Sequence, residues 1–226
     1  MLHPEVLTIS YKHRYEINKR FKEILGFLQI DHFSLDLVRP DGLMIFLSGT
    51  PSHGYEVCSK GYGAHDATIS ANYYEHNEFY WWHDVEYGFY EKEIQYIREV
   101  KHGFCYGFMM VRRWNDFYLI YSFATVQRSR RFLQRVEDSI DVLFEMGDHV
   151  YNSMRELYSE YTEDMVPPLI DKFYPFEGGE PKARYSNYQQ AKSGIYLPPV
   201  AIKPRARTKL ELVVDNLLES DKLVID

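Results

Sequence analysis

The sequence predicts an α+β fold, an α-β-α sandwich with a central antiparallel sheet. Two pairs of short apolar runs are each joined by a tight turn, which is typical of β-hairpins. Segments whose apolar residues recur at helical spacing precede, separate and follow the two pairs. Because amphipathic helices bury their apolar stripe against a sheet, this order of elements predicts a sheet between two helical layers.

The first helix is expected over residues 15–28. Its apolar side chains recur at the spacing of one helix face: Ile17, Phe21, Ile24, Leu25 and Leu28. The first hairpin follows, since the apolar runs 32–39 and 43–48 flank the turn Pro40-Asp41-Gly42. Residues 50–88 are rich in Gly, His, Asn and Tyr and are expected to be irregular or to form short helices.

The second half of the domain repeats this order. Residues 90–102 have helical spacing, and the runs 104–111 and 117–126 predict a second hairpin around the turn Trp114-Asn115-Asp116. These two runs are apolar on both faces, which places them in the middle of the sheet. A long helix is expected over residues 132–157, with Gly147 as a local weakness.

The chain divides into three parts in this interpretation. Residues 1–165 form the α-β-α domain, residues 166–209 a linker that contains Pro and Gly, and residues 210–226 a short C-terminal helix. Seven Lys or Arg and no acidic residue lie between positions 181 and 210. Such a basic linker folds back on the acidic domain, meets nucleic acid, or stays extended, and the sequence leaves these alternatives open.

Composition narrows the class of protein. The 226 residues carry a net charge of −7, which disfavours a general nucleic-acid coat. Two cysteines exclude a disulfide scaffold and suit a reducing compartment. No apolar run reaches the roughly 18 residues of a membrane span, and no signal peptide precedes the domain. We therefore expect a cytoplasmic protein without a membrane partner.

The aromatic content is high, with 20 Tyr, 14 Phe and 3 Trp. Many of these rings crowd into residues 73–84, where they mix with polar residues and follow no strand or helix period. We interpret this segment as a loop or cap over a small-molecule pocket, because aromatic rings with polar tips commonly line such pockets.

Several short motifs resemble the autoinducer-binding domain of LuxR-type quorum-sensing transcription regulators. They are Tyr62-Gly-Ala-His-Asp66-Ala-Thr-Ile69, Trp81 fifteen residues after Asp66, Phe89-Tyr-Glu-Lys-Glu-Ile94, His102-Gly103-Phe-Cys105 and Tyr121-Ser122-Phe-Ala-Thr125. The resemblance spans residues 13–160. It implies a sensor architecture similar to PAS and GAF domains, without enzymatic activity and without a cofactor or metal, that binds an acyl-homoserine lactone or a similar amphiphile.

The resemblance also implies roles for individual residues. Asp66 would accept a hydrogen bond from the ligand amide, and Trp81 would face it as a wall of the head-group pocket. Tyr62 and Tyr55 would supply ring surface and hydroxyl groups, and Ser122 would lie on the pocket floor. Trp82 belongs to the same expected ligand-binding set.

Three features depart from the family pattern. Ala67 stands where the family has Pro, and the expected Trp-x-x-x-Tyr pair is absent around His53–Val57. Fewer than thirty residues follow Pro198, too few for the family's DNA-binding helix-turn-helix. We therefore expect either a shortened chain or a stand-alone sensor that signals through a homodimer, formed by the long helix, or through partner contacts.

Two other classes of function remain open. An interaction protein, such as an anti-activator or secreted effector, would keep the sensor fold without binding a ligand. An enzyme would use Cys58 as nucleophile with His53 or His65 as base, although no triad pattern supports it. The histidines His76 and His83 lack the spacing of a zinc motif, so no metal site is expected.

Overall fold

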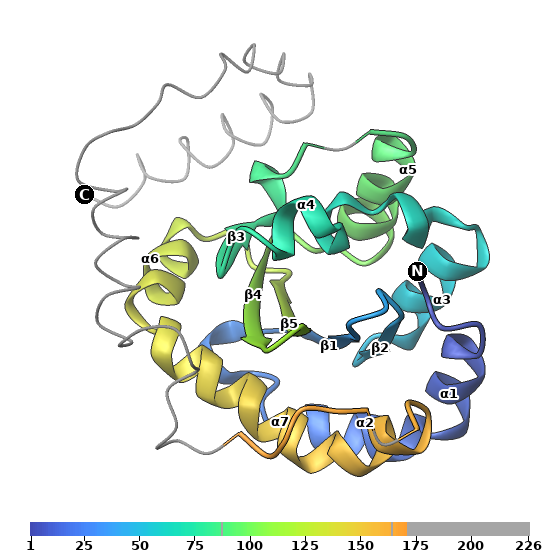
Figure 1. Cartoon of the computed structure of the whole chain (residues 1–226). Helices are drawn as coiled ribbons and strands as arrows, with labels where there is room; N and C mark the ends of the chain where they lie inside the picture. Colours follow the sequence, from blue (N-terminus) through green and yellow to red (C-terminus); the bar gives the residue numbers. More distant parts are fainter. Residues whose placement is uncertain (87, 164, 171–226) are drawn as a thin grey trace, which may run out of the picture. The chain divides into compact units, whose positions relative to one another are not determined.

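A computed structural model describes residues 1–86, 88–163 and 165–170, all within the first of two units, Met1–Gly178. The sequence predictions for residues 171–226, the basic linker and the C-terminal helix, lie outside the described residues. The described part contains a five-stranded antiparallel sheet with helices on both faces (Figure 1). The predicted α+β class is confirmed.

The sheet has the strand order β2-β1-β5-β4-β3. Its strands are β1 (His32–Val38), β2 (Met44–Ser48), β3 (Phe79–Trp81), β4 (Tyr106–Trp114) and β5 (Phe117–Thr125). Both predicted hairpins are confirmed, β1–β2 at one edge and β4–β5 in the interior, and β1 pairs with β5 to join them. Turn residues Gly42 and Asn115 adopt the positive φ angles that such tight connections need.

Short helices surround the sheet. The α-helices are α1 (Val6–Lys12), α2 (Arg14–Phe21), α3 (Pro51–Ser59), α4 (Ala71–Tyr74), α5 (Glu91–Gln95), α6 (Arg130–Asp138) and α7 (Ile140–Glu160). The 3₁₀ helices are η1 (Phe27–Gln29), η2 (Tyr62–His65), η3 (Ala67–Ile69) and η4 (Trp82–Asp84), and the π-helix η5 (Tyr96–Lys101) continues α5. The helical prediction for residues 90–102 is thereby confirmed.

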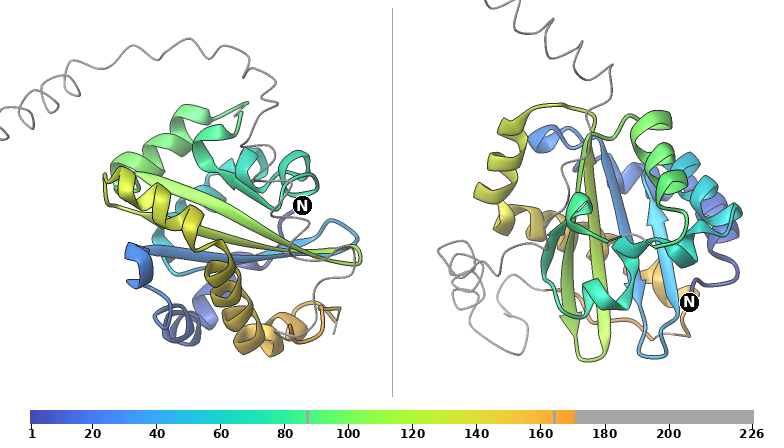
Figure 2. Two further views of the ribbon diagram at one scale, coloured as in Figure 1. Left: turned by 90° about the vertical axis from the view of Figure 1, so that its left-hand side faces the viewer. Right: turned by 90° about the horizontal axis from the view of Figure 1, so that it is seen from above.

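The helices form two layers (Figure 2). Helices α2, α6 and α7 lie along one face of the sheet, and α3, α4 and α5 with the short helices near them lie on the other. We call these the α7 face and the α3 face. Among the described residues, no helix is both long and apolar enough to cross a membrane.

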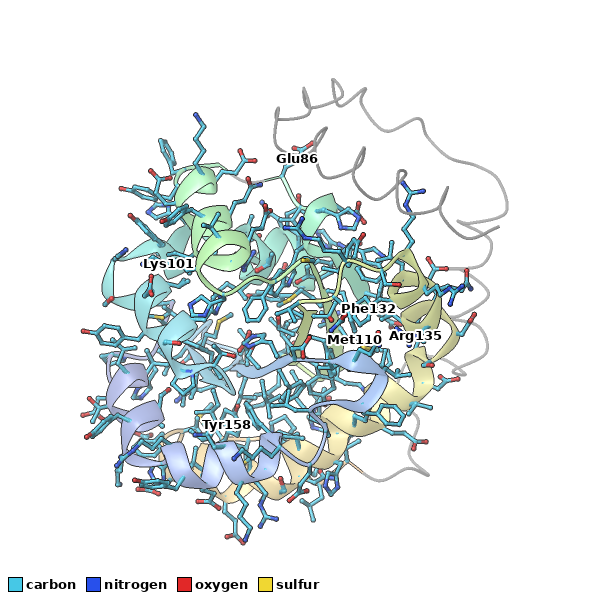
Figure 3. All side chains as sticks on the ribbon, turned by 180° about the vertical axis from the view of Figure 1, so that it is seen from behind. Glu86, Lys101, Met110, Phe132, Arg135 and Tyr158 are labelled. Carbon is cyan, nitrogen blue, oxygen red and sulfur yellow. The ribbon has the colours of Figure 1, made fainter. Side chains whose placement is uncertain are left out.

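The α7 face is packed with aromatic rings. Phe108 stacks on Phe123 with 5.1 Å between ring centroids, and Phe132 of α6 lies 6.3 Å from Phe108. Phe33 of β1 contacts Phe123 at 4.9 Å. Tyr158 of α7, labelled in Figure 3, is fully buried and donates its hydroxyl hydrogen bond to the carbonyl oxygen of Leu35. This face is an ordinary dry core.

The long predicted helix is two helices. The break lies at Ser139, between α6 and α7, and not at Gly147. Gly147 is buried in α7 where a Cβ atom would lie 2.2 Å from the ring of Tyr121. The glycine therefore allows close helix–sheet packing, a reason that helix propensity alone does not reveal.

Two other local predictions were wrong. The helix predicted over residues 15–28 corresponds to α2, which ends at Phe21. Gly26, Leu28 and Gln29 have positive φ values, so the apolar spacing continues through turns rather than through a helix. Residues Phe79–Trp81, expected in a loop or cap, form the edge strand β3 paired with β4. Three residues are too few to show a period of two, and the pairing partner is supplied by tertiary structure.

Candidate functional site

The α3 face of the sheet is polar although it is buried. Strand β1 alternates strictly, so that Phe33 and Leu35 point to the α7 face while His32, Ser34 and Asp36 point to the α3 face. These three polar residues are only 2–8% exposed. A buried polar sheet face is unusual, because burying polar groups without partners destabilises a fold. It therefore marks the candidate site.

A cavity of about 50 Å³ lies over this polar face. Its walls come from the N-terminal residue Leu2, from strands β1, β2, β4 and β5, from helix α3, from the turns η2 and η3, and from Trp82 and Arg98. The lining residues are Leu2, His32, Ser34, Asp36, Phe46, Ser48, His53, Gly54, Val57, Cys58, Gly63, Asp66, Thr68, Ile69, Trp82, Arg98, Met109 and Ser122. This volume holds more than one water molecule.

A buried ion pair closes one side of the cavity. Arg98 of η5 donates from Nη2 to Asp66 Oδ2 at 2.6 Å and to Thr68 Oγ1 at 2.9 Å. Thr68 donates from its backbone nitrogen at 3.1 Å and from its hydroxyl at 2.7 Å to Asp66 Oδ1. Both charged side chains are less than 8% exposed. The carboxylate thus accepts three hydrogen bonds, and about one of its four acceptor sites remains.

The indole of Trp82 lies against this ion pair. The Arg98 guanidinium is 4.3 Å from the ring centroid, a cation–π contact, and the indole nitrogen donates to Met109 Sδ at 3.1 Å. Gly107 of β4 makes room for the ring, because a Cβ at that position would lie 2.2 Å from it. The absence of a side chain at Gly107 therefore allows the Trp82 ring to lie against the sheet.

A row of hydroxyl groups forms the cavity floor. Ser34 of β1 pairs in register with Ser48 of β2 and with Ser122 of β5, so the three serines cross adjacent strands. Met109 of β4 extends the row as the partner of Ser122. Serine hydroxyls both donate and accept, so this floor can bind either kind of polar atom.

Asp36 is the unpaired acid of the site. It is 3% exposed, and its buried Oδ1 atom has no hydrogen-bond partner among the described residues. Burial, together with the negative charge of Asp66, raises the pKa of Asp36 well above its usual value of 3.8. The raised pKa favours the neutral form of the carboxyl group, in which it can donate a hydrogen bond.

Three histidines lead from the cavity towards the surface. His32 and His53 line the cavity with their ring centroids 5.5 Å apart, and His102 lies 5.3 Å beyond His53. His32 shares a hydrogen bond with Thr50 Oγ1 at 2.9 Å, and burial lowers its pKa to about 3. Burial also lowers the pKa of His53, whose buried Nε2 has no partner in the described structure. All the histidines of the cavity are therefore neutral.

Half of the predicted site residues meet at this cavity. Asp66, Trp82 and Ser122 line it. Tyr55 is 60% exposed on α3 and lies outside the lining. Half-buried Tyr62 contacts Tyr90 at the surface, with tilted rings and 4.9 Å between ring centroids. The ligand-binding roles of all six remain predictions.

The expectation that Trp81 faces Asp66 is wrong. The Trp81 ring contacts Phe108 with 5.3 Å between centroids, and Phe108 belongs to the α7 face that also holds Phe132. Neighbouring residues at the end of β3 diverge, so Trp82 and not Trp81 reaches the cavity. The spacing of fifteen residues after Asp66 indicates the right place in the chain but not the side of the sheet.

Sequence reasoning missed Asp36 and Arg98. A signal was present for each. The polar residues His32, Ser34 and Asp36 alternate with apolar ones along strand β1, and Arg98 follows Ile94 by four residues on the buried side of its helix. A charged residue on a buried helical stripe requires a partner, which here is Asp66.

The alternative chemistries find little support. Burial raises the pKa of the Cys58 thiol to about 12, which opposes formation of the thiolate that a nucleophile needs. Cys58 and Cys105 are both free. Within the described ranges, no group of three His, Cys, Asp or Glu side chains is placed to hold a metal ion.

Comparisons with known proteins give structural matches only. No family model and no curated protein sequence matches the chain. A structure of SdiA in complex with octanoyl-rac-glycerol is similar at 14% identity and a TM-score of 0.44, over 82% of this chain and 71% of that one. A structure of Escherichia coli SdiA is similar at 14% identity and a TM-score of 0.45, over 82% and 73%.

A third structure is that of CepR2 from Burkholderia cenocepacia, an N-acylhomoserine lactone-dependent transcription factor of the LuxR family. It is 13% identical with a TM-score of 0.46, over 71% of this chain and 99% of that one. At these values the comparison concerns the path of the chain alone.

Proposed function

We propose that residues 1–165 form a non-enzymatic small-molecule sensor domain, whose site is the cavity on the α3 face. The observation that carries the proposal is the set of buried polar groups there, above all the Asp66–Arg98 ion pair beside Trp82. A convergent set of polar groups in a partly apolar cavity is typical of ligand sites.

The proposed ligand is an amphiphile with a polar head group, such as an acyl-homoserine lactone, as the sequence resemblance implies. Asp66 keeps about one free acceptor site after its bonds to Thr68 and Arg98. That site suits one ligand N–H group, and Ser122 supplies a hydroxyl on the floor.

The signal is proposed to pass through a homodimer formed along α7, or through contacts with another protein, in transcription regulation of the quorum-sensing kind. The two free cysteines agree with a cytoplasmic location.

The test is a thermal-shift and calorimetric screen of the purified chain with N-octanoyl-homoserine lactone, 1-octanoyl-glycerol, octanoate and 2-decanone. A compound that binds the folded state raises the melting temperature by mass action. Adjacent tryptophans provide matched variants, because Trp82 lines the cavity and Trp81 faces the other side of the sheet. Trp82→Ala should abolish the shift, and Trp81→Ala should retain it at a lower melting temperature.

A second candidate is an interaction protein that keeps the fold without binding a ligand. The size of the cavity favours it, since about 50 Å³ is well below the roughly 300 Å³ of typical ligand pockets. In that case no compound of the panel shifts the melting temperature. Equal shifts for Trp82→Ala and the unchanged protein would likewise contradict the proposed site.

A further inference from the structure

The charges of the cavity are balanced before any ligand enters. Asp66 and Arg98 neutralise each other at 2.6 Å, and the Arg98 guanidinium also covers the Trp82 ring. Apart from Asp36, the remaining polar lining consists of hydroxyl groups, the Cys58 thiol and the two histidines, whose lowered pKa values favour their neutral forms. The only cation among the described lining residues, Arg98, is already paired with Asp66. Transfer of an anionic ligand from water into the cavity is therefore unfavourable.

Asp36 is the one acid of this lining that the ion pair does not use. Its Oδ1 atom is buried and has no hydrogen-bond partner in the described part of the chain. The charged and titratable groups packed around it are His32 of the same strand, His53 and Cys58 of α3, Asp66 between η2 and η3, Arg98 of η5 and, across the sheet, Tyr158 of α7. A buried polar atom without a partner destabilises a fold, so a fold that retains one commonly uses it.

We propose that Asp36, as a neutral carboxylic acid, donates a hydrogen bond to an oxygen atom of an uncharged ligand head group, with Ser34 and Ser122 bonding further oxygens. This assignment rests on the proposed sensor function and deepens it. Asp36 and the two serines lie on adjacent strands with Ser34 in register with Ser122, so one compact head group can reach all three. Burial and the nearby Asp66 raise the pKa of Asp36, which keeps its proton in place.

The chemistry of the floor selects hydroxyl and carbonyl oxygens. A protonated carboxyl group and a serine hydroxyl each offer one donor together with acceptor sites. A head group with several hydroxyl or carbonyl oxygens complements these groups without introducing charge. A cavity of about 50 Å³ accommodates only a compact head group, so an attached acyl chain must find space outside it.

Three probes with the same number of carbon atoms in the chain test the head-group charge: 1-octanoyl-glycerol, octanoate and octylamine. Their dissociation constants are measured by calorimetry on the full chain and on Asp36→Asn, Asp36→Leu and the control Asp84→Asn, whose side chain is 60% exposed. Asn keeps a neutral donor and acceptor with the shape of the acid, whereas Leu keeps the size and removes both. Circular dichroism confirms that each variant is folded.

We expect 1-octanoyl-glycerol to bind the unchanged protein more tightly than octanoate or octylamine. Asp36→Asn and Asp84→Asn should stay within about threefold of that affinity, and Asp36→Leu should lose about tenfold or more, the effect of one hydrogen bond with its buried partner left unpaired. Raising the pH should weaken binding to the unchanged protein and leave Asp36→Asn unaffected.

The failures are distinguishable. If 1-octanoyl-glycerol binds and Asp36→Leu binds it equally well, the role of Asp36 is wrong while the sensor function stands. If octylamine binds best and Asp36→Asn abolishes that binding, the ligand is a cation and the neutral-acid assignment is overturned. If no probe binds the unchanged protein, both the sensor function and the role of Asp36 are contradicted.

Discussion

The two faces of one sheet differ in almost every physical property. The α7 face is packed with aromatic rings, with Phe123 in contact with both Phe33 and Phe108. The α3 face carries Ser34, Asp36 and other polar groups around a cavity. Both faces are built from the same strands by alternation, so each strand serves packing and chemistry at once. The difference indicates that the α3 face carries the candidate function.

The polar groups on the α3 face stabilise the fold less than aliphatic side chains at the same positions would. A row of aliphatic side chains there would bury more apolar surface and leave no unpartnered acid. Functional sites are where such departures from optimal stability are expected. Mutations should therefore affect the two faces differently.

The largest loss is expected for Arg98→Ala. The substitution leaves the Asp66 carboxylate buried without its counter-charge, which costs about 3–5 kcal/mol of unfolding free energy. The matched control is Arg112→Ala, because the Arg112–Asp148 pair is partly exposed, with 25% and 13% of the side chains accessible. Urea denaturation should show a clearly smaller loss for the control. Equal losses would mean that burial does not distinguish the two pairs.

Neighbouring residues of β5 separate the two faces directly. Phe123→Ala removes a fully buried ring from the α7 face and should cost about 3–5 kcal/mol. Ser122→Ala removes one cavity hydroxyl and should change the unfolding free energy by less than about 1 kcal/mol. The same denaturation experiment measures both. A loss of several kcal/mol for Ser122→Ala would show that the hydroxyl row is structural.

Two glycines, one on each face of the sheet, allow the effect of an added methyl group to be compared between the faces. A Cβ at Gly147 would lie 2.2 Å from the Tyr121 ring on the α7 face, and a Cβ at Gly107 would lie 2.2 Å from the Trp82 ring at the cavity. Both substitutions to Ala should destabilise by about 1–3 kcal/mol through overpacking. Gly107→Ala should in addition change the tryptophan fluorescence and weaken ligand binding. If Gly147→Ala weakens binding as strongly, the two faces are coupled.

The unfolding free energy should also depend on pH through the titration of Asp36. Because the pKa of Asp36 is raised in the folded state, that state keeps a proton that the unfolded chain releases above its usual pKa near 3.8. Asp36 therefore makes the unfolding free energy fall as the pH rises from about 4 towards the folded pKa, by up to about 1.4 kcal/mol per pH unit. Below the unfolded pKa both states are protonated and this contribution disappears.

Asp36→Asn isolates this contribution. Its advantage in stability over the unchanged protein should grow with pH across the same window, as measured by denaturation at a series of pH values. The histidines His32 and His53, whose pKa values are lowered, act in the opposite sense but are present in both proteins. A constant difference between the two proteins would contradict a neutral Asp36.

Local patterns predicted most of the fold. The turn Pro40-Asp41-Gly42 and its flanking runs predicted the hairpin β1–β2, and the segment 90–102 predicted the helix that carries Arg98. Strand β3 was missed because three residues carry no period. The break at Ser139 was missed because the apolar stripe continues across it.

The site was predicted less completely. Asp66, Trp82 and Ser122 were placed correctly at one cavity, but Trp81 was assigned to the wrong side of the sheet. An ion pair such as Asp66–Arg98 joins residues 32 positions apart, and nothing local in the chain indicates which acid meets which base.

The sequence by itself determined the order of helices and hairpins, because turn residues and apolar periodicity act between near neighbours in the chain. It also fixed which β1 side chains share a face, since alternation is a property of any strand. Tertiary structure alone decided that the polar face would be buried and that Arg98 would neutralise Asp66. It also decided that Asp36 Oδ1 would be buried without a hydrogen-bond partner among the described residues. Burial and pairing depend on segments far apart in the chain, which meet only when the sheet and its two helical layers assemble.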